Sequence, residues 1–202
     1  VATSILCFLS SLLLSRFLAK FLRDKGFIDN PNQRSSHKTP TPRGGGLAIL
    51  FSLALAFLIF YIFGILRFHF SFYIAVLLIA ILSFIDDKIN LSAGIRFLVH
   101  IGSALLVVYY TGGLEKLPFP DPLNYSLSWL VYPISLIWIL GTMNIFNFLD
   151  GIDGYAGFQI LIYALGLGLF FPGLWPLALV MGLSSIGFLF SNWHPAKIFM
   201  GD

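Results

Sequence analysis

Long runs of apolar residues alternate with short polar segments along this chain. The runs are continuous, without the polar residue at every second position that marks a half-buried strand. Backbone groups must pair internally in lipid, so continuous runs near the length of about 20 residues that crosses a bilayer predict helices and not a closed barrel. About seven helices are expected, at residues 1–17, 46–66, 70–86, 96–111, 127–146, 155–171 and 174–191.

Composition supports a membrane setting for these helices. Hydrophobic residues make up 58% of the chain and charged residues only 10%, whereas about 25% of a typical soluble domain is charged. The single cysteine, Cys7, lies within an apolar run and is expected to act as a small hydrophobic residue. No internal repeat is visible. We therefore expect an all-α, polytopic transmembrane bundle that forms a single domain over residues 1–202.

Basic residues give the bundle an orientation. Arg16, Lys20, Arg23 and Lys25 follow the first apolar run, whereas a signal peptide carries its charges before that run. If the first helix runs inward, ten of the twelve Lys and Arg residues lie in or directly beside the inner segments, as the positive-inside rule requires. The sequence thus predicts an outer N-terminus, with inner segments at about residues 16–45, 87–95, 147–154 and 192–202.

Two adjacent acids, Asp86 and Asp87, stand where the third apolar run meets this inner side. Neighbouring carboxylates repel each other, and a nearby cation or a raised pKa favours such a pair. Hard divalent cations prefer oxygen ligands of this kind. Two interpretations stay open: a cation site, or a solvated helix end with Lys88 as the counter-charge.

A polar stripe ends the fifth apolar run. Asn144, Asn147 and Asp150 recur every three residues, and the sequence Gly-Ile-Asp-Gly that follows, with Asp153, breaks the helix as the chain reaches water. Amides and acids on an otherwise apolar helix are costly in lipid. A functional site that faces protein or a cavity is therefore expected here.

The first inner loop is rich in basic and titratable residues. Arg34, His37, Lys38 and Arg43 lie among prolines and precede three glycines at a helix start, Gly45 among them. Glycines let backbone N–H groups approach a phosphate, and a helix N-terminus attracts anions. Orientation alone also explains basic residues on the inner face, so both interpretations remain.

The chain finishes Pro195-Ala-Lys-Ile-Phe-Met-Gly-Asp202, again on the inner side. This segment, the basic loop, the acid pair and the stripe occur in an order that resembles the polyprenyl-phosphate N-acetylhexosamine-1-phosphate transferases, glycosyltransferase family 4. The Lys-Ile-Asn-Leu-Ser that follows the acid pair is closer to the WecA-like, O-antigen-initiating branch. The resemblance covers nearly the whole chain.

The resemblance implies an enzyme that transfers N-acetylhexosamine 1-phosphate from a UDP-sugar to polyprenyl (undecaprenyl) phosphate, releases UMP and starts a lipid-linked cell-envelope glycan. The implied setting is the inner membrane with a cytoplasmic active site, and the cofactor is Mg²⁺, with Mn²⁺ as the alternative. No nucleic-acid partner is expected, and a homodimer is left open. The roles carried over are catalysis by Asp86, Asp87, Asp150 and Asp153, metal binding by Asp202 and Asn147, and substrate binding by Arg34, His37, Lys38, Arg43, Gly45 and Asn144.

Two departures from the family pattern matter. His100 stands where the family usually has Gln, and family members continue past Met-Gly-Asp into further spans and a histidine-rich loop. We therefore expect the chain to be an N-terminal part of a longer enzyme and inactive alone, with the identity of the sugar open. The alternative function is a cation-coupled transporter with an Asp/Asn ion site, although such sites lie near the bilayer midplane.

Overall fold

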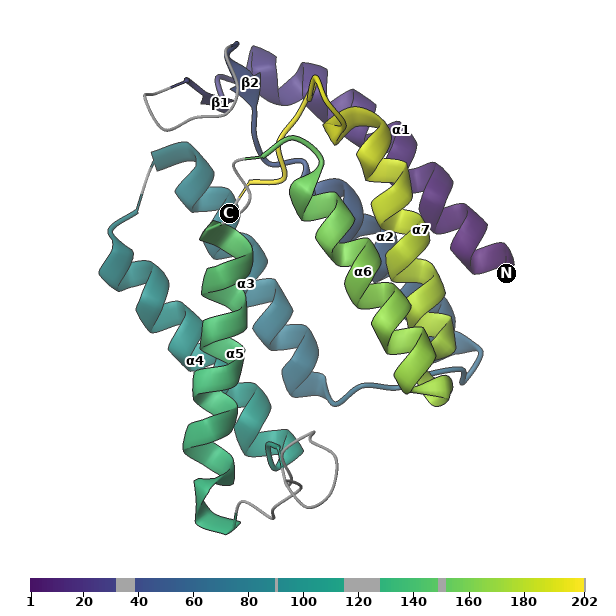
Figure 1. The fold of residues 1–202 in the computed structure, drawn as a ribbon, viewed down its shortest axis with the longest axis vertical. Helices are drawn as coiled ribbons and strands as arrows, with labels where there is room; N and C mark the ends of the chain where they lie inside the picture. The colour runs from purple at the N-terminus through teal and green to yellow at the C-terminus, as the bar shows by residue number, and fades with distance from the viewer. Residues whose placement is uncertain (32–38, 90, 115–127, 149–151, 202) are drawn as a thin grey trace. The chain divides into compact units, whose positions relative to one another are not determined.

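The computed structural model describes residues 1–31, 39–89, 91–114, 128–148 and 152–201, and most of these residues are helical (Figure 1). They divide into two compact units, Val1–Arg67 with Phe148–Asp202, and Phe68–Asn147. The elements are α1 (Ala2–Asp24), β1 (Ile28–Asp29), β2 (Thr41–Pro42), α2 (Gly46–Ile62), α3 (Phe70–Ile89), α4 (Ala93–Thr111), η1 (Ser128–Leu130), α5 (Val131–Phe148), α6 (Tyr155–Phe170), η2 (Pro172–Leu174) and α7 (Trp175–Asn192).

The prediction of an all-α polytopic membrane protein is confirmed. Among the described residues, four helical segments are long and apolar enough to span a bilayer, namely Ala2–Asp24, Phe70–Ile89, Ala93–Thr111 and Pro172–Asn192. Three shorter apolar helices accompany them. Large apolar side chains such as Leu13 and Phe170 are exposed, as lipid-facing residues would be. The outer N-terminus and the single domain stay predictions.

Helix α1 runs seven residues further than its apolar run predicted. Arg16, Lys20 and Arg23 are exposed, whereas Leu18 and Leu22 are buried. The last two turns therefore continue as an amphipathic helix whose apolar side packs into the protein. Composition of the run alone could not show this, because charges on one face interrupt the hydropathy but not the helix.

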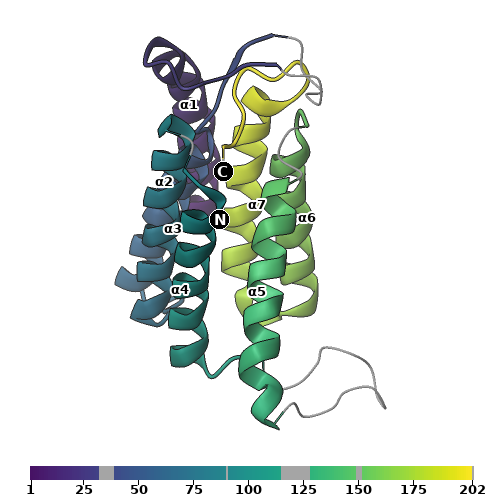
Figure 2. The same ribbon diagram turned by 90° about the vertical axis from the view of Figure 1, so that its left-hand side faces the viewer.

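In the first unit, α7 packs against α1, α2 and α6, and Figures 1 and 2 both show α6 and α7 side by side. Small residues allow the close approach. A Cβ on Gly187 would lie 2.5 Å from the backbone oxygen of Phe8, and the hydroxyls of Ser15 and Ser191 are 3.0 Å apart. Small residues and interhelical hydroxyl bonds are the usual means of helix association in lipid.

A compact apolar cluster lies where the polar segments of this unit meet. Its buried members come from α1, the β1 region, α2, α7 and the C-terminal residues: Leu18, Leu22, Phe27, Ala48, Ile49, Phe188 and Ile198. The two short strands pair antiparallel, with Ile28 opposite Pro42 and Asp29 opposite Thr41. This cluster brings the end of the chain against the start of α2.

The second unit is built on α3 and α4, which pack against each other. Helix α5 is tied to the end of α4 by Ser135, whose hydroxyl accepts the N–H of Leu114 at 2.7 Å and donates to the carbonyl of Val131 at 2.6 Å. Gly113, with φ of +76°, leaves room for that hydroxyl. The acid pair stands on the last turn of α3.

Candidate functional site

The predicted site residues fall into both units. Asp86, Asp87 and Asn144 belong to the second unit, and Arg43, Gly45 and Asp153 to the first. Asn147 lies in the last turn of α5, and its side chain is outside the described part. Also outside it are Arg34, His37, Lys38, Asp150 and Asp202.

The acid pair is buried at the end of α3. Asp86 and Asp87 are each only 5% exposed, so the interpretation as a solvated helix end is wrong. Asp86 accepts the backbone N–H of Leu91 at 2.5 Å and a hydrogen bond from Nη1 of Arg96 at 3.0 Å. Both of its oxygens therefore hold the turn from α3 into α4, and Arg96 supplies a positive charge that compensates the buried carboxylate.

The stripe on α5 is described at one position. Asn144 is exposed, and its amide donates to the carbonyl of Leu140 one turn earlier at 2.7 Å. A polar side chain that bonds its own helix in this way satisfies a donor without a partner from another element. That the stripe faces protein or a cavity stays a prediction.

The glycines before α2 pack against the C-terminal segment. The N–H groups of Gly45 and Gly46 donate to the carbonyls of Phe199 and Met200 at 2.9 and 2.8 Å, and Phe199 N donates to Pro42 at 2.8 Å. The Gly45 amide therefore donates to the chain's own backbone, and a role of Gly45 in phosphate binding stays a prediction. Arg43 is half-buried beside these glycines.

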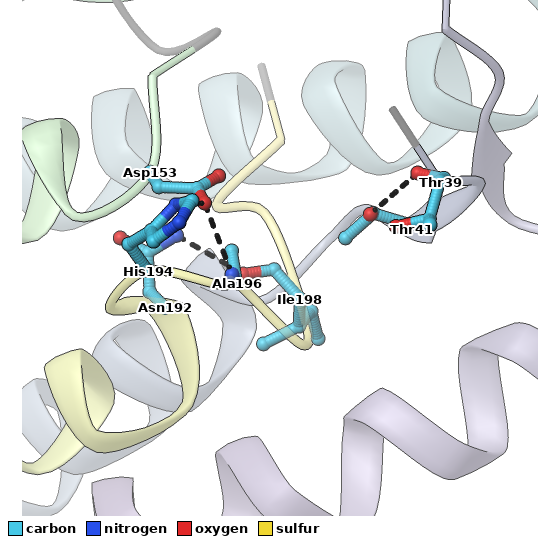
Figure 3. A network of polar contacts seen from close by, with 7 residues as sticks. All are labelled: Thr39, Thr41, Asp153, Asn192, His194, Ala196 and Ile198. Atoms are coloured by element: carbon cyan, nitrogen blue, oxygen red, sulfur yellow. Dashed lines mark hydrogen bonds and ion pairs between the residues drawn. The ribbon is translucent and has the colours of Figure 1, made fainter. Parts of the chain in front are cut away.

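Asp153 lies in the turn before α6 and contacts the C-terminal segment (Figure 3). Its Oδ2 accepts hydrogen bonds from Nδ1 of His194 at 2.8 Å and from the backbone N–H of Ala196 at 3.1 Å. The carboxylate accepts, so Nδ1 is the protonated ring nitrogen. Oδ1 of Asp153 is buried and has no hydrogen-bond partner among the described residues.

Asn192, at the end of α7, supports the same segment. It is buried, and its Nδ2 donates to the carbonyl of Ile198 at 3.0 Å (Figure 3). Its Oδ1 is likewise buried without a partner in the described part of the chain. Two acceptor oxygens, from Asp153 and Asn192, are thus left for a donor or a cation near one loop.

Comparison with known proteins identifies the family of this chain. The family model described as Glycosyl transferase family 4 matches residues 69–202, which include the acid pair, the stripe and the C-terminal segment. The chain belongs to glycosyl transferase family 4. The resemblance inferred from the motifs is confirmed.

Relatives of this family 4 chain are long proteins. A probable undecaprenyl-phosphate N-acetylglucosaminyl 1-phosphate transferase of Bacillus subtilis is 34% identical over 212 residues, which cover 100% of this chain and 58% of the relative. A decaprenyl-phosphate N-acetylglucosaminephosphotransferase of Mycolicibacterium smegmatis is 33% identical over 88% of this chain and 49% of its own length. A phospho-N-acetylmuramoyl-pentapeptide-transferase of Synechococcus is 38% identical over 56% of this chain and 35% of its own length. The chain thus matches about half the length of the first two relatives and about a third of the last.

Three residues that contact predicted site residues or the C-terminal segment of this family 4 chain were missed in the sequence. Arg96 on α4 pairs with Asp86 on α3, and Asn192 and His194 hold the C-terminal segment. Asn192 and His194 could have been found from the sequence, because they are polar residues that directly follow an apolar run, as Asp86 and Asp87 do at the end of the third run. Arg96 carried a weaker signal, a cation at the first position of an apolar run.

The donor set of the family 4 site suits a hard cation. In the described part of the chain, three His, Cys, Asp or Glu side chains do not gather in one place, and the predicted ligand groups of Asn147 and Asp202 lie outside that part. The side chains concerned nevertheless offer carboxylate and amide oxygens, which Mg²⁺ and Mn²⁺ accept. The buried, unpartnered oxygens of Asp153 and Asn192 are of the same kind.

Proposed function

We propose that this chain forms the catalytic part of an enzyme that transfers N-acetylhexosamine 1-phosphate from a UDP-sugar to undecaprenyl phosphate and releases UMP. The observation that carries the proposal is the buried pair Asp86 and Asp87 at the polar end of a spanning helix in a family 4 chain. A lipid phosphate and a water-soluble nucleotide can meet only at such an end. The names of the relatives, two of which specify N-acetylglucosamine, point to the same reaction.

The reaction needs one bond to form and one to break. An oxygen of the acceptor phosphate attacks the sugar-bearing phosphorus of the donor, and the bond from that phosphorus to the bridging oxygen breaks, so that the oxygen leaves with UMP. A phosphate monoester is largely ionised at pH 7 because its second pKa is about 6. Direct attack therefore needs little base catalysis, and positioning with charge stabilisation carries most of the rate.

The charges of two phosphate groups call for a cation. Asp202 and Asn147 would hold Mg²⁺, or Mn²⁺ in its place, with Asp86 and Asp87 holding the ion and the acceptor. When bound, the ion neutralises charge on the phosphate oxygens. Asp86 keeps the α3–α4 turn in place through Leu91 and Arg96, so the pair is presented on a fixed backbone.

The remaining site residues bind and orient the substrates. Basic side chains of the first loop would attract the two phosphate-bearing substrates. The polar groups in the last part of α5 and in the residues before α6 would shape the nucleotide pocket. We place this site on the cytoplasmic face of the inner membrane, with the N-terminus outside. The residues concerned are Arg34, His37, Lys38 and Arg43 for the loop, and Asn144, Asp150 and Asp153 for the pocket.

The complete gene product, purified with its native ends, tests the proposal. It is incubated with undecaprenyl phosphate and a panel of UDP-sugars, and UMP and lipid-linked product are measured. We expect product with UDP-N-acetylglucosamine first and with an N-acetylated 6-deoxyhexosamine next, and none without the acceptor or in EDTA. Absence of product with every UDP-N-acetylhexosamine would refute the proposed function. Ion-driven solute uptake into vesicles would favour the transporter.

A further inference from the structure

The C-terminal loop, residues 193–201, is fixed on two sides by hydrogen bonds. Toward α2 it is held through Phe199 and Met200, whose carbonyls accept the N–H groups of Gly45 and Gly46. Toward α7 it is held by the N–H of Lys197, which donates to Ser191 at 2.8 Å, and by Asn192. The loop leads directly to Asp202, the proposed metal ligand.

Asp153 holds the loop on a third side, at the start of α6. One of its oxygens accepts from both His194 and Ala196, which stand 41 and 43 positions later in the chain. The neighbouring Gly154 adds an apolar contact, because a Cβ at this position would lie 3.2 Å from the ring of Trp193. Both donors to Asp153 belong to the loop, and a carboxylate strengthens such bonds relative to a neutral acceptor.

We propose that Asp153 is a positioning residue that holds the C-terminal loop, and through it Asp202, in the geometry that the transfer requires. The inference rests on the proposed function and gives Asp153 a different task from that of the acid pair. Its Oδ2 is used by the loop, so the side chain acts by fixing a segment of backbone. A displacement of about 1 Å at a reacting group can lower a rate by about a hundredfold.

Asparagine separates positioning from charge at this site. Its carbonyl oxygen can accept from both His194 and Ala196, and its amide nitrogen would take the place of Oδ1, which has no hydrogen-bond partner among the described residues. Asp153→Asn therefore keeps the two hydrogen bonds from His194 and Ala196, which we call the clasp, and loses the negative charge. Asp153→Ala loses both, and Asp24→Ala, at an exposed acid on α1, is the matched control.

Hydrogen exchange measures the clasp without any substrate. We expect the Ala196 amide to exchange about five- to tenfold faster in Asp153→Ala, the effect of losing one hydrogen bond, with faster exchange at Phe199 as well. Asp153→Asn and Asp24→Ala should exchange at the wild-type rate. If Asp153→Ala does not fold, Asp153→Glu, which displaces the carboxylate by one methylene, should show the faster exchange.

Turnover of the complete gene product then links the clasp to the reaction. We expect kcat to fall by about a hundredfold in Asp153→Ala and by less than about tenfold in Asp153→Asn. The proposal would be overturned if the Ala196 amide exchanged at the wild-type rate in Asp153→Ala. It would also be overturned if Asp153→Asn showed wild-type exchange at Ala196 but a kcat as low as that of Asp153→Ala. If the wild-type protein transfers no sugar phosphate, the proposed function fails, and the exchange rates still decide whether Asp153 holds the loop.

Discussion

Gly45 offers a sharp test of how the start of α2 is built. Its φ of −65° is open to any residue, so substitution by alanine tests space alone. The added Cβ would lie 2.6 Å from a ring carbon of the fully buried Phe188, 2.9 Å from the carbonyl oxygen of Phe199 and 3.1 Å from Ile198. None of these atoms is the free end of a flexible side chain, so the backbone of the C-terminal loop must move.

The expected cost follows from two effects. Overpacking of a filled interior costs about 1–3 kcal/mol, and weakening the bond from Gly45 N–H to Phe199 adds about 1 kcal/mol. Gly45→Ala should therefore lower the free energy of unfolding by about 2–4 kcal/mol. At Gly166, inside α6, an added Cβ would have no atom within 4 Å outside its own stretch of helix. Gly166→Ala should therefore leave stability unchanged or raise it by up to about 1 kcal/mol.

Unfolding of residues 1–202 in mixed micelles by SDS, followed by tryptophan fluorescence, measures both variants. The two explanations of Gly45 predict different results. If the glycine exists to bring its amide to a phosphate, Gly45→Ala would keep its stability and bind polyprenyl phosphate more weakly. A change in stability below about 0.5 kcal/mol, the range of ordinary surface substitutions, would refute the packing argument.

Three further predictions concern charge, metal and orientation. Arg96→Gln should destabilise the protein by about 1–3 kcal/mol, because it removes the charged donor that bonds the buried Asp86. Arg67→Gln at an exposed position should change stability little. SDS unfolding compares the two variants, and equal effects would contradict the pairing. Asp202→Asn in the complete gene product should lower turnover by at least about a hundredfold, which is the effect of losing one strong electrostatic contributor. The variant should still insert into the membrane normally. Release of UMP by the wild-type enzyme in EDTA would contradict the metal role. Orientation is tested with single cysteines in a background without Cys7, labelled by an impermeant thiol reagent. A cysteine at Arg67 should be labelled from one side of the membrane, and a cysteine at each of four proposed inner positions from the opposite side. Labelling of those four positions from different sides would refute the predicted orientation. The four positions are exposed residues at proposed inner segments: Lys20, Lys88, Ile152 and Lys197.

Hydropathy was enough to predict the helices, since in lipid any continuous apolar run must pair its own backbone groups. The seven predicted runs correspond to α1–α7. Their ends were less predictable. Helix α1 continues to Asp24 because Leu18 and Leu22 find an apolar cluster formed by residues far along the chain, and no local pattern reports such a partner.

The sequence by itself determined the fold class and the family, and it predicted which acids form the site, because spans and motifs are local and are written in consecutive residues. Only the tertiary structure decided what those residues touch. Asp86 meets Arg96, Gly45 meets Phe199, and Asp153 meets His194 and Ala196. The contacts of Gly45 and Asp153 join segments more than 40 positions apart in the chain. Helix packing brings these donors and acceptors together, and the sequence of either segment alone carries no pattern that indicates the partner.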